Sequence, residues 1–411
     1  MITTIRLFNY KIYLQEFLVI FFCFLLVEKS FIWFFSQNAY INEVAIKALS
    51  IAIYGYVLIK VNDLKLSEKI YVGIFTALMV KLLLQSLIEF QVFFRNFEIY
   101  TVIFPIIFTI FIKSEMRKMN ADLLGFLAGF YLLSYLVFMA LFGHNFSFSL
   151  EHIEPNTGPF SGDTRILHAH SIFMLIIPFL WYLNKFINKQ TIQSFLLFAL
   201  CFTIILVHQH RSVWSSVIFA TFVYFILVLR TNKKALTGVA SFTLTSILAL
   251  IIAIYFVSAT FPGLLSFFGE RFSEILNPST DSGTGGFRIE QTEMYYNFIK
   301  QKPLFGWTFE GYSLENPLVD WWDANTGHHF HEGFVEILFY HGIFGLLFKF
   351  SFLIYIFFKS FSRHLSNRAV VLIPFCLSGL VFSLSYVAPL IFWGHVGLCL
   401  YYLESNKTFK S

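Results

Sequence analysis

The chain has 411 residues, of which 57% are hydrophobic, 20% aromatic and only 13% charged. A soluble protein of this length needs more polar residues to cover its surface, so the composition excludes a soluble globular enzyme and indicates a protein solvated by lipid. The formal net charge of +5 is expected to come from cytoplasmic loops. It therefore reports membrane topology and does not indicate a nucleic-acid partner.

Apolar stretches recur along the whole chain. A helix needs roughly 20 mainly apolar residues to cross the hydrocarbon core of a bilayer, and about twelve stretches approach that length. We therefore predict an all-α, polytopic helix bundle that forms a single integral membrane domain over residues 1–411. The predicted spans are 16–35, 44–61, 70–90, 97–112, 121–142, 167–184, 191–207, 213–229, 236–257, 333–358, 369–387 and 388–404. The four cysteines fall within these spans and are expected to be packing residues: Cys23, Cys201, Cys376 and Cys399.

The orientation follows from the basic residues, because Lys and Arg in short loops are retained in the cytoplasm. With the N-terminus inside, 18 of the 29 Lys and Arg residues fall in cytoplasmic segments and seven fall outside. This division predicts that both termini are cytoplasmic. It also predicts two outer loops, 143–166 and the much longer 258–332. A loop as long as 258–332 is seldom a mere connection, so we expect it to be partly helical and to hold the chemistry.

Histidines are concentrated on the predicted outer side. Imidazole works as acid, base or metal ligand near neutral pH, so these residues are candidates for chemistry, although any single one could be polar filler. Three His-x-His pairs leave a metal site open as an alternative. We do not favour it, because the outer acidic residues show no ligand-like spacing. The nine outer histidines are His144, His152, His168, His170, His208, His210, His328, His329 and His331.

Two outer arginines give a sharper signal. Arg211 begins a predicted span, and helix N-termini already favour anions. Arg288 follows Gly285 and Gly286 at the start of a helical run that ends at Pro303. A guanidinium presents a fork of donors that matches phosphate oxygens, so both positions suit an anionic lipid headgroup. The alternative is that each arginine reaches the interface or pairs with an acid such as Glu290.

An ordered set of motifs runs from the middle of the chain into the tenth span. The motifs are Thr157-Gly158-Pro159-Phe160-Ser161-Gly162-Asp163, His210-Arg211-Ser212, Gly286-Phe287-Arg288, Lys302-Pro303-Leu304-Phe305-Gly306, and His331 followed by Gly342 and Gly345. In these motifs, over residues 157–350, the chain resembles the O-antigen ligase and polymerase superfamily of bacterial surface-polysaccharide enzymes. Glu332 departs from the pattern, because the family often has asparagine after the histidine.

The resemblance implies a GT-C-like fold in the bacterial inner membrane, with the active site facing the periplasm. It implies metal-independent transfer of glycan from undecaprenyl diphosphate, without a cofactor, to lipid A core or to another lipid-linked glycan. Arg211 and Arg288 fit the task of binding the diphosphate, and His331 fits that of a general base. Possible supporting residues are Glu332, Arg165 and His210. Possible sugar-stacking residues, which could equally be membrane-interface anchors, are Trp307, Tyr312, Trp321 and Trp322.

The product class stays open at this point. The arrangement of Arg211, Arg288 and His331 is slightly closer to a ligase, and a polymerase would use the same chemistry. A flippase or transporter for lipid-linked oligosaccharides is the alternative from another class. It would use ionisable residues near the bilayer midplane, for which Lys47, Lys81 and Lys349 are candidates, but the chain shows no internal repeat.

Overall fold

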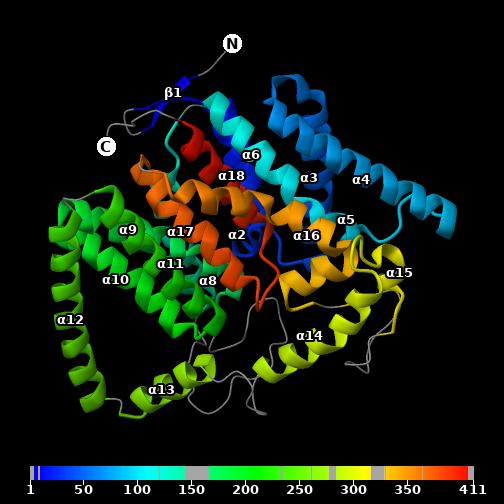
Figure 1. Cartoon of the computed structure of the whole chain (residues 1–411). Coiled ribbons are helices and arrows are strands. Elements are labelled where there is room, and N and C mark those ends of the chain that lie inside the picture. The colour runs from blue at the N-terminus through cyan, green and yellow to red at the C-terminus, as the bar shows by residue number, and fades with distance from the viewer. Residues whose placement is uncertain are drawn as a thin grey trace.

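The computed structural model is a bundle of helices (Figure 1). It describes residues 4–7, 10–119, 121–143, 166–232, 235–260, 262–276, 284–315, 328, 330–362 and 364–405. The first half holds α1 (Leu14–Val27), α2 (Lys29–Phe35), α3 (Ala39–Ile59), a 3-10 turn η1 (Val61–Asp63), α4 (Leu66–Phe90), α5 (Phe97–Ile103), α6 (Pro105–Met119), α7 (Leu124–Phe142), α8 (Ala169–Met174) and α9 (Ile176–Lys189). The second half holds α10 (Ile192–Val207), α11 (Arg211–Thr231), α12 (Ala235–Thr260), α13 (Pro262–Leu276), α14 (Thr284–Gln301), α15 (Thr308–Tyr312), α16 (Gly333–Ser360), α17 (Asn367–Phe382) and α18 (Leu390–Glu404).

A short hairpin precedes the bundle. Strands β1 (Thr4–Leu7) and β2 (Tyr10–Tyr13) pair antiparallel, with Thr4 opposite Tyr13. This hairpin is the exception to the predicted all-α class among the described residues, and a search for apolar spans could not find it because it lies outside every span.

By length and composition, seven of the described helices could cross a membrane, or up to nine if each of two bent pairs is one span. Three shorter apolar helices, α10, α17 and α18, coincide with three further predicted segments. The observed class is therefore a polytopic membrane bundle, and the count of twelve spans stays a prediction. In α12, only 6% of the most apolar window is buried, as expected for a helix whose surface is solvated by lipid.

Both bent pairs have a local cause. The helices α1 and α2 meet at 95°. Glu28 is the N-cap of α2, and its carboxylate accepts the Phe31 N–H at 2.9 Å, so a new helix starts at this point. The helices α5 and α6 meet at 50°. Pro105 begins α6, and a proline has no N–H with which to continue the ladder of the preceding helix.

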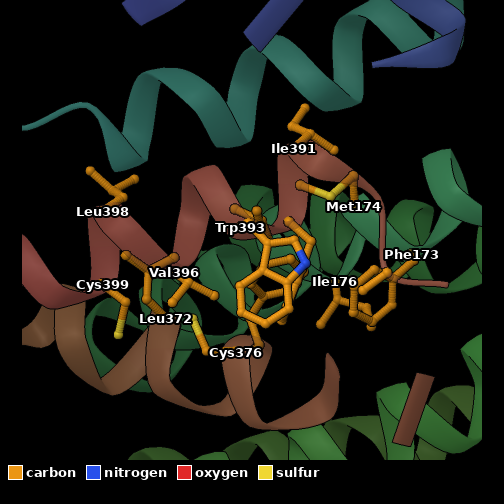
Figure 2. Packing of buried hydrophobic residues seen from close by; sticks show 14 of the residues in the cluster. Phe173, Met174, Ile176, Leu372, Cys376, Ile391, Trp393, Val396, Leu398 and Cys399 are labelled. Carbon is orange, nitrogen blue, oxygen red and sulfur yellow. The ribbon is translucent and has the colours of Figure 1, made fainter. Parts of the chain in front are cut away.

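Aromatic packing fills the centre of the bundle. Trp393 on α18 is fully buried and packs edge-on against Phe350 at 5.6 Å between ring centroids. Figure 2 shows Trp393 among side chains of Phe173, Ile176 and Leu372, which come from α8, α9 and α17. The four cysteines are buried and free, in agreement with their predicted packing role. Such dense contacts supply the dispersion energy that holds helices together in lipid.

Paired charges tie the helix ends together at one end of the bundle, here called the basic end. Arg117 on α6 donates two hydrogen bonds to Glu68 on α4, at 2.8 and 2.6 Å. Lys113 lies 3.0 Å from Glu68 and 2.5 Å from Glu404 at the end of α18. Since each charge has an opposite partner, the cost of removing it from water is offset.

The opposite end, here called the α14 end, is crossed by α13 and α14, which Figure 1 shows far from β1. The helices α11 and α16 begin there, and α12 ends there. Helices α13, α14 and α15 all fall within the predicted long loop 258–332. The predicted outer loop 143–166 lies almost entirely outside the described residues.

Candidate functional site at the α14 end

One face of α14 holds Arg288 next to the start of α16. Gln291 and Thr292 follow Arg288 by three and four residues, so all three side chains share a helix face. The Gln291 side-chain oxygen accepts the backbone N–H of His331 at 3.3 Å. The Thr292 hydroxyl donates to the Glu332 carboxylate at 2.6 Å. The helix α14 therefore brings Arg288 to the His331–Glu332 pair, which begins 43 residues further along the chain.

The loop after α17 closes the same site from the other side. The guanidinium of Arg288 lies over the ring of Tyr386, 5.2 Å from its centroid. The N–H of Gly333 donates to the Ser383 carbonyl at 3.0 Å. A Cβ atom at Gly333 would lie 3.2 Å from the Tyr386 carbonyl oxygen, a tight contact, so the absence of a side chain at this position favours the close approach of α16 to this loop.

Opposing effects act on the pKa of the Glu332 carboxyl group. Partial burial raises this pKa, while the hydrogen bond from Thr292 and the charge of Arg288 act to lower it. The hydrogen bond from Thr292 ties the carboxylate to α14, and the positive charge of Arg288 acts on it electrostatically.

The turn at Pro303 locks α14 to α16. The N–H groups of Ile343 and Phe344 donate to the Pro303 and Leu304 carbonyls at 2.8 and 3.1 Å. Gly342, which has φ of +62°, makes room for this turn, since a Cβ atom there would lie 2.5 Å from the Leu304 backbone. The Pro-Leu-Phe-Gly motif and Gly342, the first of the two glycines in the His331 motif, are thus two halves of one joint.

Arg211 lies at the first position of α11, after a tight backbone turn. Gln209 has φ of +53°. The His208 ring contacts the Ile204 carbonyl oxygen at 2.8 Å, and His210 Nε2 lies 3.1 Å from the Leu167 carbonyl oxygen. His208, Gln209 and His210 are all buried, so the turn that presents Arg211 is held firmly against the start of α8.

The first turn of α8 connects the two arginine-bearing parts of the site. Leu167 touches His210 beside Arg211, as described above. Three residues on, the His170 ring lies 5.9 Å from the ring of Tyr386, which in turn stacks on Arg288. His168 and His170 pack at 4.6 Å, and the charge of Lys29 acts on both. Helix α8 therefore joins the surroundings of Arg211 and Arg288 into one region with several cationic or ionisable groups.

The comparison with protein families decides the class of this region. Residues 196–350 match the family model described as O-antigen ligase. The match includes Arg211, Arg288, the Pro303 turn and His331, and it confirms the resemblance to the O-antigen ligase and polymerase superfamily. No curated protein matches the chain. The match covers residues 196–350 of the 411, and together with the apolar helices it supports a membrane enzyme of the O-antigen ligase or polymerase type that acts in polysaccharide biosynthesis.

In this O-antigen ligase-type region, the predicted aromatic residues differ in their surroundings. Tyr312 is 5% exposed, which leaves its ring without the open face that sugar stacking needs. The indole N–H of Trp307 donates to the Phe298 carbonyl at 2.8 Å, and Lys302 lies over the indole at 4.5 Å. Both residues thus serve the packing of α14 and α15. Arg165, Trp321 and Trp322 lie outside the described residues.

Two His-x-His pairs, His168/His170 and His208/His210, lie wholly within the described residues. Within the residues that the structure describes, no group of three or more His, Cys, Asp or Glu side chains is arranged to hold a metal ion. His329, one member of the third pair, lies outside those residues. His328 has another role, because its Nε2 atom lies 2.6 Å from the Leu314 carbonyl oxygen and its Nδ1 atom contacts the Tyr295 hydroxyl.

Three residues of the site were not anticipated from the sequence. Gln291 and Thr292 carried a usable signal, because positions three and four after Arg288 on a helix share its face. Tyr386 carried none. It lies almost one hundred residues from Arg288, and only the packing of α14 on the loop after α17 brings the two side chains together.

Proposed function

We propose that this chain is a membrane glycosyltransferase that moves a glycan from undecaprenyl diphosphate to an acceptor hydroxyl at the α14 end of the bundle. The family match supports the O-antigen ligase or polymerase type. The observation that carries the proposal is the placement of Arg288, through α14, beside His331 and Glu332. Arg211 lies at the start of α11, and the contact between His210 and the Leu167 carbonyl holds this start against the residues that precede α8.

The chemistry assigns one task to each group. The acceptor hydroxyl gives its proton to the imidazole of His331, and its oxygen bonds to the anomeric carbon of the donor glycan. The bond between that carbon and the diphosphate oxygen breaks, and its electron pair leaves with the diphosphate. Arg211 and Arg288 offset the charge that develops on this leaving group. Glu332 is a positioning residue, because it is bonded to Thr292 and acts on Arg288.

The acceptor that we favour is the lipid A core, as for a ligase, and a second lipid-linked repeat unit is the polymerase alternative. Reconstituted protein in vesicles would be given the undecaprenyl-diphosphate-linked glycan with each acceptor separately. A ligase forms a new glycosidic bond only with the lipid A core acceptor. A polymerase instead forms a lengthened lipid-linked glycan when the lipid-linked repeat unit is the acceptor, and forms no product with the lipid A core. Donor that crosses the bilayer without forming a new bond contradicts the proposal in favour of a flippase.

We expect Arg211, Arg288 and His331 to be required separately for transfer. His331→Ala should lower the rate by about 100-fold to 10,000-fold, the usual effect of losing a general base. Arg211→Lys and Arg288→Lys keep the charge but lose the bidentate fork, so each should cost about tenfold or more, as for one charge-assisted hydrogen bond.

Two matched variants control for these substitutions. Arg230→Lys changes the arginine at the other end of α11, where the guanidinium donates to the Ser362 carbonyl at 3.2 Å. His364→Ala removes an exposed histidine beyond α16. Both should transfer normally, and all variants should melt within a few degrees of the parent protein. Near-normal transfer by His331→Ala, or an Arg288→Lys protein that is inactive because it no longer folds, contradicts the mechanism.

We also expect transfer without a divalent metal, because arginines occupy the positions where the diphosphate should bind. The purified enzyme would be assayed with and without EDTA at the same ionic strength. Unchanged turnover is the expected result. A complete loss that added Zn²⁺ or Mg²⁺ reverses would instead support a metal site that includes the His-x-His pairs.

A further inference from the structure

A cleft of about 570 Å³ opens at the basic end, between α1, α3 and α6. Its apolar wall is formed by Val19, Leu49, Ile53 and Phe111. Its charged lining residues are Glu16, Lys60, Asp63 and Lys118, here called the mouth because Lys60 and Asp63 are exposed, and the buried Glu115. A smaller cleft of about 360 Å³ continues from it and shares Tyr56, Lys60, Asp63 and Lys118. The glycan transfer proposed above uses none of these residues, which lie at the opposite end of the bundle.

The charges at the mouth are only partly paired with one another. Lys118 donates to Glu115 at 2.7 Å and to the Tyr56 hydroxyl at 3.2 Å. An ammonium has three donors, so one of them stays available to a ligand. Among the described residues, Lys60, Asp63 and Glu16 make no ion pair with another side chain. The mouth therefore offers cationic and anionic groups together, which suits a ligand that carries both charges.

The cleft also opens towards lipid. Leu18 and Phe22 on α1 are 50% and 60% exposed, and Val19, which lines the cleft, is 38% exposed. Ile51 on α3 is 61% exposed. Because a patch of exposed apolar side chains marks a surface that contacts lipid or another protein, a molecule can enter the cleft sideways from the bilayer. An acyl chain would then lie along Val19, Leu49 and Ile53.

We propose that this cleft binds a zwitterionic aminophospholipid of the phosphatidylethanolamine type. Its phosphate lies between Lys60 and Lys118, its ammonium lies near Asp63 and Glu16, and one acyl chain fills the apolar wall. A purely anionic lipid would satisfy the two lysines but would leave the two carboxylates facing more negative charge. The bound lipid bridges α1, α3 and α6 at the basic end.

The test is native mass spectrometry of the full chain released from detergent, after titration with phosphatidylethanolamine or with phosphatidylglycerol of the same acyl chains. Two variants change the cleft: Lys60→Glu reverses the phosphate-binding charge, and Ala52→Trp fills the space beside Ile53. Their matched controls are Lys189→Glu, an exposed lysine of α9, and Ile51→Trp, the exposed neighbour of Ala52 on α3.

We expect the parent protein to retain phosphatidylethanolamine in preference to phosphatidylglycerol. Each cleft variant should lower that retention by about tenfold, the order expected for losing one charge-assisted contact or the seat of the acyl chain, while the controls retain it fully. Melting temperatures of all five proteins would show that the variants fold. Equal retention of the two lipids, or equal retention by cleft variants and controls, overturns the proposal. Either result would mean that the lipid binds non-specifically to the apolar surface and not in this cleft.

Discussion

His328 shows how a single buried residue can make the α14 end sensitive to pH. Its Nε2 atom faces the Leu314 carbonyl oxygen and must carry the proton, so Nδ1 accepts from the Tyr295 hydroxyl. Burial lowers the pKa of His328, and the Leu314 and Gly311 carbonyls oppose that effect only in part. The folded state thus prefers neutral imidazole, and a second proton on Nδ1 would break the bond with Tyr295.

This preference sets the sign of a stability change. Because the folded pKa lies below the unfolded value of about 6.5, the unfolded chain binds more protons at acidic pH. The stabilising contribution of His328 is therefore complete above about pH 6.5 and declines as the pH falls towards its folded pKa. We expect the melting temperature of the parent protein in detergent to fall as the pH is lowered through this range.

His328→Gln isolates that contribution, because an amide can donate to Leu314 and accept from Tyr295 but does not titrate. Its melting temperature should fall less than that of the parent protein when the pH is lowered. His364→Gln, at an exposed histidine, should behave as the parent protein does. An acid-induced fall of the same size in His328→Gln and the parent would show that other groups cause it.

At the scale of elements, the joint between the Pro303 turn and the kink of α16 holds the site together. The turn accepts two N–H groups of α16, and in the other direction the Trp307 N–H donates to the Phe339 carbonyl at 2.7 Å. Helix α14, which carries Arg288, ends at this turn. His331 and Glu332 immediately precede the first residue of α16. The joint between the turn and α16 therefore sets the distance between Arg288 and His331.

Gly342→Ala tests this joint. The added Cβ would meet the Leu304 carbonyl at 2.5 Å, at a residue with φ of +62°. Strain and overpacking should together cost about 2–4 kcal/mol, seen as lower resistance to unfolding by denaturant and as weaker transfer. Gly55→Ala on α3, where the added Cβ meets no atom within 4 Å, should be neutral or slightly stabilising. Equal stability of the two variants would contradict the account of the joint.

At the scale of the whole molecule, some features followed from the sequence and others could not. Apolar runs predicted the helices, because lipid requires every backbone group to be satisfied within a helix. The bend at Glu28 was not predicted, since it depends on a buried carboxylate that caps α2. Motif order predicted that Arg288 and His331 work together; the family match spans both residues, and their joint action stays a prediction. The contact between Arg288 and Tyr386 depends on packing between distant segments, which no local pattern encodes.

The orientation of the bundle is the prediction on which the function depends most. Lys65, Lys113, Arg117 and Lys118 share the basic end with Glu404. Because basic residues are retained in the cytoplasm, we expect that end to be inside. The α14 end, with Arg288 and His331, would then be outside, where we propose that a lipid-linked glycan meets its acceptor. The four native cysteines are buried, so an impermeant thiol reagent should give little background.

We expect Glu290→Cys, an exposed position on α14, to be labelled by that reagent in intact cells. Lys189→Cys, an exposed position at the end of α9, should be labelled only after the membrane is permeabilised. Both positions lie on helices whose bounds are described, and both replace a charged surface residue, so neither substitution should disturb folding. The parent protein, treated in the same way, measures reaction at the buried native thiols. If Lys189→Cys is labelled in intact cells and Glu290→Cys only after permeabilisation, the α14 end faces the cytoplasm. Transfer on the outer side, and with it the assignment of lipid A core as the acceptor, would then be wrong.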